Sequence, residues 1–229
     1  MSGPRPATGI TAFDGALRAV VAAARAGRAG VRPLTARSTR AAVGTAYLDL
    51  VLMRAAARGA APWVVGQLVP RLPLDSARAL AAVLGPALHR DDGPYGEYRR
   101  QVGTLAALPA AGPVPLEVLR GDRPPFGEPA AYDGPLRAPT RELTRDLVAE
   151  LDELRSGYGA LAPGDPRGWA AAERHALLGA AAACLSQLRH NGPELLLGAL
   201  GRVAVRLGRP APECRTAWEG AAFARAVAA

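Results

Sequence analysis

The side chains that could carry chemistry in this 229-residue chain are few, and they lie far apart in the sequence. There are three histidines, His89, His175 and His190, and two cysteines, Cys184 and Cys214. No histidine stands near a cysteine or a carboxylate at the spacing of metal ligands, and no paired-cysteine motif is present. A single histidine on a helix is more often structural than a ligand. The sequence therefore predicts no metal site and no catalytic residue.

Two pairs of adjacent carboxylates could act as general acids and bases, but each has a simpler interpretation. Asp91 and Asp92 stand in the segment HRDDGP, where turn formation and helix capping account for them. Asp152 and Glu153 fall on the polar side of a leucine-striped helix, which is typical of a solvated face. The chain also lacks a Gly-any-Ser-any-Gly motif and a phosphate-binding glycine loop after a strand. We expect that it is not an enzyme on its own.

The elements that must position these side chains are predicted to be helices. Hydrophobic residues make up 49% of the chain but aromatic residues only 5%, so the apolar content is mostly Ala, Leu and Val. Ala and Leu are the strongest apolar helix formers, whereas strands favour β-branched and aromatic residues. The composition predicts an all-α fold whose helices pack closely over small side chains.

The charge balance suggests an anionic partner at first sight. The formal net charge is +8 and the isoelectric point is about 10.6. Every basic residue apart from histidine is Arg, however, and the Arg residues are scattered rather than clustered. Such usage, with abundant Ala, Gly and Pro, is typical of the codon bias of a GC-rich genome. A solvated basic surface is the preferred interpretation, and nucleic-acid binding is a weaker alternative.

The hydrophobic pattern divides the chain into four parts. The central segment is dense in Pro and Gly and cannot hold a long helix, so it is either a linker or an ordered strap. The predicted parts are a flexible tail (1–9), a four-helix-bundle region (10–108), the Pro/Gly-rich segment (109–139) and a helical extension (140–229).

Helix ends are predicted from capping residues. Thr11 and Thr140 are expected to be N-caps, and Asp165 followed by Pro166 is expected to open a long helix. Pro86 is expected to kink a helix that begins at Asp75.

No targeting or membrane segment is expected. The segment MSGPRPATGITAF lacks the hydrophobic region of a signal peptide, and no apolar run reaches about 18 residues without a charge or a breaker. We expect a cytoplasmic protein. Helices rich in Ala usually associate, so we also expect a homodimer or a heteromer.

Four segments together resemble the C-terminal helical part of acyl-CoA dehydrogenase-like flavoproteins, and most closely a divergent, extended bacterial branch. The likeness lies in their order and covers most of residues 10–195. The first three resemble the first helix, the second helix and the helix near the flavin of that domain, and the fourth resembles a helix of the extension. They are GALRAVVAAARAGRAG, LTARSTRAAVGTAYLDLVLMRAAARG, LVPRLPLDSARALAAVLGPALH and AERHALLGAAAACLSQLRHN.

The resemblance implies an antiparallel four-helix bundle and a flavin held by a fuller partner subunit. Arg28 and Gly30 keep the family's flavin-contacting pattern after the first helix, and Arg28 is the implied contact to a partner-held FAD. Ala29 stands where the family has an aromatic residue. The segment Ala110-Ala111-Gly112 stands where many members have an acidic residue before Gly, and the nearby Glu117 does not match. The implied role is a non-catalytic or half-site subunit, with no cofactor of its own.

Two other functions stay open. The chain could be a free-standing helical protein–protein interaction module without flavin. It could also be a helical DNA-binding regulator, which the positive charge alone favours.

Overall fold

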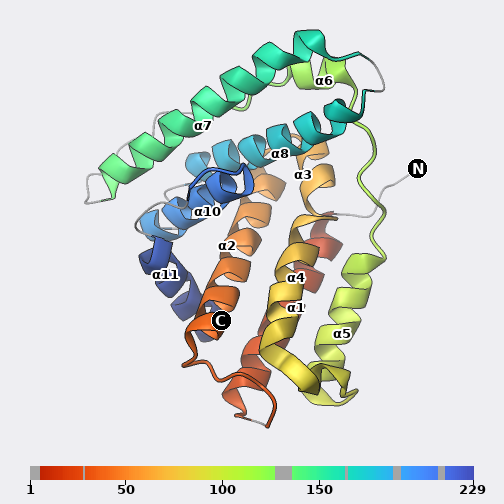
Figure 1. Cartoon of the computed structure of the whole chain (residues 1–229), viewed down its shortest axis with the longest axis vertical. Coiled ribbons are helices and arrows are strands. Elements are labelled where there is room, and N and C mark those ends of the chain that lie inside the picture. Colours follow the sequence, from red (N-terminus) through yellow and green to blue (C-terminus); the bar gives the residue numbers. More distant parts are fainter. Residues whose placement is uncertain (1–5, 28, 127–135, 163–164, 188–191, 211–214) are drawn as a thin grey trace. The chain divides into compact units, whose positions relative to one another are not determined.

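Every element in the described part of the chain is a helix (Figure 1). The computed structural model describes residues 6–27, 29–126, 136–162, 165–187, 192–210 and 215–229. Within those ranges the chain forms α-helices and short 3₁₀-helices, and no β-strand. The prediction of an all-α fold is confirmed, and its physical cause is a chain dominated by Ala and Leu.

The helices belong to two compact units, which we describe separately. Unit 1 comprises Met1–Val51, Val69–Ala110 and Glu213–Ala229, and unit 2 comprises Leu52–Leu68 and Ala111–Pro212. One change of unit, at Ala110, coincides with the start of the predicted Pro/Gly-rich segment. The hydrophobic pattern did not anticipate the other changes of unit, because they depend on contacts between distant segments.

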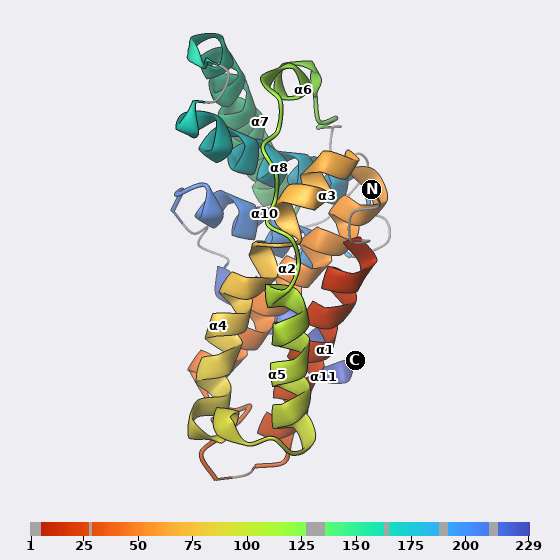
Figure 2. The same cartoon turned by 90° about the vertical axis from the view of Figure 1, so that its right-hand side faces the viewer.

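Unit 1 is built around α1 (Pro6–Arg25), which packs along α5 (Gly93–Ala106) and α4 (Leu72–Leu84) (Figure 2). Residues 37–51 of α2 (Arg37–Gly59) and the last helix, α11 (Arg215–Ala228), complete the unit. In the views, α1 and α4 run in one direction and α2 and α5 in the other. The buried stripe of α1 includes Phe13, Leu17 and Val20, at the spacing of one helical face.

Two glycines allow α1 to approach α5 closely. A Cβ atom at Gly9 would lie under 3.0 Å from the side chains of Val69 and Leu108, and one at Gly15 would lie 3.0 Å from Gln101. The beginning of α1 is therefore next to the end of α5, and the pair is antiparallel.

The last helix, α11, packs against α1 and α2. The backbone carbonyl of Glu219 lies directly against Gly44, where a Cβ atom would clash. Arg25 donates a hydrogen bond from Nη2 to the carbonyl of Val227, and the Arg40 guanidinium lies 5.5 Å from the centre of the Phe223 ring. The sequence-based division placed α11 in the helical extension, whereas its contacts place it in unit 1.

A glycine turn ends α4 earlier than the sequence predicts. Gly85 adopts φ 54°, a conformation that favours Gly, and the carbonyl oxygen of Gly30 lies 2.7 Å from where a Cβ would stand. The 3₁₀-helix η1 (Gly85–His89) follows directly. The expected kink at Pro86 is thus a break, since Pro86 cannot donate to the preceding turn.

Unit 2 is built around α8 (Pro166–Ser186). It is contacted by α3 (Pro62–Leu68), α6 (Leu116–Gly121), α7 (Arg137–Gly157) and α10 (Pro193–Arg206). Every residue from His175 to Leu185 is buried, and nearly all of them are apolar, as in a helix enclosed on all sides. Asp165 accepts a hydrogen bond from the Arg167 backbone N–H, so the predicted N-cap of this helix is confirmed.

The Pro/Gly-rich segment contains a short helix and contacts unit 2. Within it, α6 buries Leu116 and Leu119. Gln67 also donates a hydrogen bond from Nε2 to the carbonyl of Gly112, at 2.7 Å. The first part of the segment is therefore an ordered strap. Its residues 127–135 lie outside the described ranges.

The other two predicted caps are wrong. Helix α1 begins at Pro6, so Thr11 lies inside it. Helix α7 begins at Arg137, and the Thr140 hydroxyl donates to the Leu136 carbonyl at 2.7 Å instead of accepting from the backbone. Threonine can satisfy its hydroxyl inside a helix in this way, so it marks a helix start less strictly than Asp.

Among the described residues, one segment is long and apolar enough, by length and composition alone, to cross a membrane. It is Ala7–Arg25 in α1, and 56% of its most apolar window is buried within the protein. The sequence analysis expected no such segment because it required an apolar run without charges. In this helix Arg18 and Asp14 form an ion pair at 2.7 Å, and the apolar face packs on α4 and α5.

Candidate functional site

The residue that the resemblance singles out cannot be placed. Arg28 lies outside the described residues, as do His190 and Cys214. Its role as a contact to a flavin therefore stays a prediction. Gly30, two residues further on, adopts φ 85°.

The other candidate residues differ in their burial and in their hydrogen-bond partners. Asp152 and Glu153 are exposed, which confirms a solvated face. Cys184 is a core thiol, and burial raises its pKa to about 12. Asp92 precedes α5 at the N-cap position but makes no capping hydrogen bond with its side chain, which instead accepts from Arg90 at 3.1 and 3.2 Å. The capping role predicted for Asp92 is therefore wrong.

His175 is the one predicted candidate that lies in a polar cluster within the described residues. We call this group the His175 cluster; it consists of Trp63, Asp122, Tyr158 and His175. His175 comes from the middle of α8, and Tyr158 begins the 3₁₀-helix η2 (Tyr158–Ala160) directly after α7. Asp122 follows α6, and Trp63 is in α3. All four belong to unit 2.

The imidazole of His175 lies between a hydroxyl and a carboxylate. The Tyr158 hydroxyl is 2.6 Å from Nδ1, and a carboxylate oxygen of Asp122 is 3.3 Å from Nε2. A proton on Nε2 faces the carboxylate favourably, so Nδ1 accepts the hydrogen bond and Tyr158 donates it. The contact to Asp122 falls short of good hydrogen-bond alignment, so its attraction is mainly electrostatic.

Burial keeps the imidazole neutral. His175 is fully buried, and this desolvation lowers its pKa, although the Asp122 carboxylate opposes the shift. The Arg155 guanidinium, which donates to the Asp122 backbone carbonyl, adds to the lowering. The Trp63 ring meets the imidazole edge-on, with the ring centres 5.3 Å apart.

A carboxylate, an imidazole and a hydroxyl in series have the connectivity of a nucleophilic triad. An activated nucleophile must be accessible and easily deprotonated, however. Tyr158 is 2% exposed, and burial raises the pKa of its hydroxyl further above the ordinary value. The His175 cluster is therefore built to hold unit 2 together and not to attack a substrate.

Hydrogen bonds from two arginine side chains to backbone carbonyls connect the cluster to α6. Arg155 donates to the carbonyls of Asp122 and Arg120, and Arg120 donates to the carbonyl of Tyr158 at 2.9 Å. Leu116, Leu119 and Ala172 pack beside the Tyr158 ring in one apolar group. The strap is thus fixed to the end of α7 and to α8.

A second buried polar contact joins α7, α8 and the residues after α10. Glu150 is 5% exposed and accepts hydrogen bonds from Arg174 and from Arg209, the latter at 2.7 Å. Burial alone would raise the pKa of Glu150, but the two guanidinium groups outweigh it and lower the pKa. The pair of arginines satisfies a carboxylate that burial would otherwise destabilise.

Unit 1 holds a cavity of about 740 Å³ between α4, η1 and α5. His89, the other described histidine, is exposed at its rim. The cavity is open to solvent and its walls are mainly apolar, so it is a place in unit 1 where a small ligand could bind.

Sequence reasoning missed Asp122 and Tyr158 because no local pattern connects them with His175. A weaker signal was present. His175 lies next to the apolar run of α8, and a buried imidazole requires polar partners from other segments.

No protein-family model, curated protein or solved structure matches the chain. Functional inference therefore rests on the order of the helices and on these sites.

Proposed function

We propose that the chain is a non-catalytic helical subunit of an acyl-CoA dehydrogenase-like complex, in which a fuller partner subunit holds the FAD. The observation that carries this proposal is the placement of the resembling segments. The first three correspond to α1, to α2 and to α4 with η1, which follow one another in alternating directions. The fourth corresponds to α8 of unit 2.

The proposed arrangement of α1, α2, α4 and α5 is an antiparallel four-helix bundle like the C-terminal domain of that family. Its support is the packing of α1 on α4 and α5, together with a buried hydrogen bond from the Ser76 hydroxyl in α4 to Asp49 in α2. Consecutive antiparallel helices joined by short connections are the usual construction of such bundles.

The proposed mechanism is completion of a neighbour's site. A flavin site needs walls and hydrogen-bond donors from several elements, and the partner would supply most of them. In this proposal Arg28, in the connection between α1 and α2, contributes a positive charge to the flavin phosphate. A cytoplasmic location is part of the proposal.

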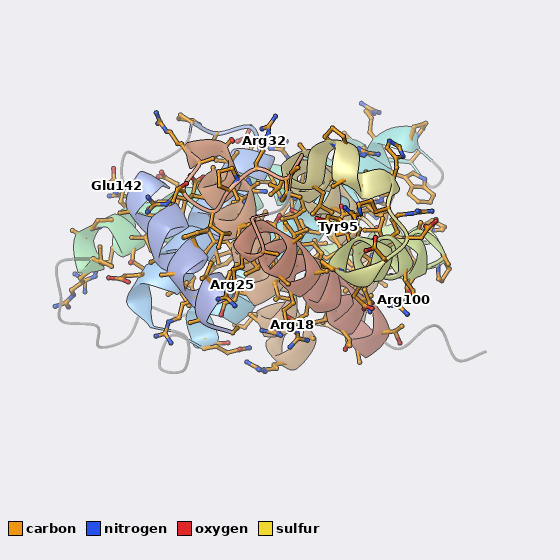
Figure 3. All side chains as sticks on the ribbon, turned by 90° about the horizontal axis from the view of Figure 1, so that it is seen from below. Arg18, Arg25, Arg32, Tyr95, Arg100 and Glu142 are labelled. Carbon is orange, nitrogen blue, oxygen red and sulfur yellow. The ribbon has the colours of Figure 1, made fainter. Side chains whose placement is uncertain are left out.

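The test is co-expression with the acyl-CoA dehydrogenase-like protein encoded nearest to this chain. We expect a complex that co-purifies and shows flavin absorbance in the visible range, whereas the chain alone is colourless. Arg28→Ala should lower the flavin content of the complex. The matched control is Arg18→Ala, an arginine of α1 whose side chain is 57% exposed (Figure 3), and it should leave the flavin content unchanged.

Each alternative function predicts a different result. A stable complex with a protein that contains no flavin would favour the helical interaction module. A complex whose flavin content is the same with Arg28 and with Ala at that position would remove the proposed half-site. Salt-dependent binding to DNA would favour the regulator.

A further inference from the structure

The cavity in unit 1 has an apolar floor built from two helices. Leu74, Ala77 and Ala81 of α4 are spaced to share one helical face, and Val102 of α5 also lines the cavity. Tyr98 lies across the floor with its hydroxyl donating to the Ala77 carbonyl. Tyr98 is 3% exposed and its hydroxyl is already satisfied, so it contributes to the cavity wall without offering a polar contact to a ligand.

The rim of the cavity is charged, with an excess of positive groups. Arg78 and Arg99 line it together with one carboxylate, Asp91. Arg99 is paired with Asp91, and Arg78 lies 3.6 Å from Asp75 in an exposed contact. The Arg78 side chain is 84% exposed, so its present contact is weak and easily exchanged. One guanidinium at the rim can thus turn to an anionic group without breaking a buried contact.

The size of the cavity favours a small molecule over a protein helix. A helix with side chains is about 10–12 Å wide, so each turn fills roughly 400–600 Å³. The cavity, at about 740 Å³, therefore holds less than two turns of a helix. The same volume lies within the range of small-molecule sites, about 300–1,000 Å³.

We infer that the cavity between α4, η1 and α5 binds a small amphipathic acid, with its apolar chain on the floor and its single negative charge at Arg78. The inference does not depend on the proposed partner, because the whole cavity belongs to unit 1. Arg is suited to this role, since its guanidinium can donate two parallel hydrogen bonds to a carboxylate.

Decanoate, decan-1-ol and decylamine test the two parts of this inference by isothermal titration with the full-length chain, below the micelle concentration. We expect saturable binding of decanoate that is about tenfold tighter than binding of the alcohol, since the latter lacks the charge-assisted contact. Decylamine should bind more weakly than either.

Two variants locate the site. Ala81 is half-buried on the cavity wall, so Ala81→Phe should fill the cavity and reduce decanoate affinity at least about tenfold. Ala79→Phe is the matched control, because Ala79 is exposed in the same helix and does not line the cavity. Arg78→Ala should weaken decanoate binding while leaving decan-1-ol unaffected.

Three outcomes would overturn the inference. They are absence of saturable decanoate binding, equal losses for Ala81→Phe and Ala79→Phe, and equal affinity for decanoate and decan-1-ol. A flavin-containing complex in the co-expression experiment would not alter any of them, so the two proposals fail or succeed separately.

Discussion

At the residue scale, the His175 cluster is the most constrained polar group of unit 2. Its members come from α3, from the segment after α6, from η2 and from α8. Each polar contact is buried or nearly so, and a buried polar group that loses its partner is costly. The stability of unit 2 should therefore be sensitive to the loss of single polar atoms of the cluster.

Tyr158→Phe should destabilise unit 2. The substitution keeps the ring but removes the hydroxyl that donates to Nδ1 of His175 at 2.6 Å. A buried acceptor left unsatisfied costs about 1–3 kcal/mol. Urea unfolding measures the loss, and Tyr47→Phe, on a half-buried tyrosine of α2 outside the cluster, is the control. Equal stability of Tyr158→Phe and the native protein would contradict the assigned hydrogen bond.

Acid should also destabilise unit 2 through His175. Its folded-state pKa is below the ordinary 6.5, so the unfolded chain binds the proton more readily. The stabilisation is complete above about pH 6.5 and is lost as the pH falls toward the folded-state pKa. The groups that face the imidazole are the Asp122 carboxylate, the Tyr158 hydroxyl and the Arg155 guanidinium.

The measurement is the urea midpoint at pH 7.5 and at pH 5.5, which differ by about one pH unit on each side of the ordinary histidine pKa. His175→Gln should flatten the fall in stability between them, at the cost of lower stability at pH 7.5. The exposed His89 provides the control, and His89→Gln should keep the native slope. If both variants keep that slope, the buried imidazole is not the cause.

The sequence predicted the chemistry of single residues better than their partners. Cys184 and the pair Asp152–Glu153 could be placed correctly because their helix patterns settle burial locally. Asp122 lies 53 positions before His175 and in a Pro-rich segment, so only the tertiary fold brings the two together. A local sequence pattern does not show which residues far apart in the chain lie close together in the fold.

At the element scale, glycines set how closely the helices of unit 1 pack. Gly44 lies against the backbone of α11, and Gly9 and Gly15 allow α1 to approach α5. The helices were predictable from composition, but these close approaches were not. Helix starts were also predicted only in part from the sequence. Asp165 starts a helix as predicted, whereas Thr11 and Thr140 lie inside their helices.

Gly44→Ala should destabilise unit 1. The added methyl would clash with the carbonyl of Glu219, so α11 would have to shift. Overpacking of this kind costs about 1–3 kcal/mol. Gly103→Ala is the control: it lies in α5 with open space around it, so it should stabilise the protein by about 0.4–1 kcal/mol. Thermal unfolding should show a lower midpoint temperature for Gly44→Ala and a higher one for Gly103→Ala. Stabilisation by Gly44→Ala would contradict the contact.

At the scale of the whole molecule, the arginines that give the net charge of +8 are spread along the sequence. Several exposed arginines already have carboxylate partners, including Arg18, Arg100 and Arg167. These ion pairs reduce the positive charge that the described residues offer to a nucleic acid.

We expect no DNA binding at physiological salt. Non-specific binding that depends on charge alone has a dissociation constant of about 10⁻⁴–10⁻⁶ M under those conditions. A gel-shift experiment with the chain at about 0.1 µM, tenfold below the smallest of these dissociation constants, should therefore show mostly free DNA. Retardation at that concentration that weakens as salt is raised would contradict this expectation and favour the regulator.

The membership of α11 in unit 1 has a consequence for how the protein is made. Helix α11 follows α1 by about 190 residues, so a ribosome adds it roughly 10–40 s later. During that interval the Val227 carbonyl that receives Arg25 does not yet exist, and the Gly44 surface of α2 is uncovered. Unit 1 can therefore complete its packing only after its last helix has been synthesised.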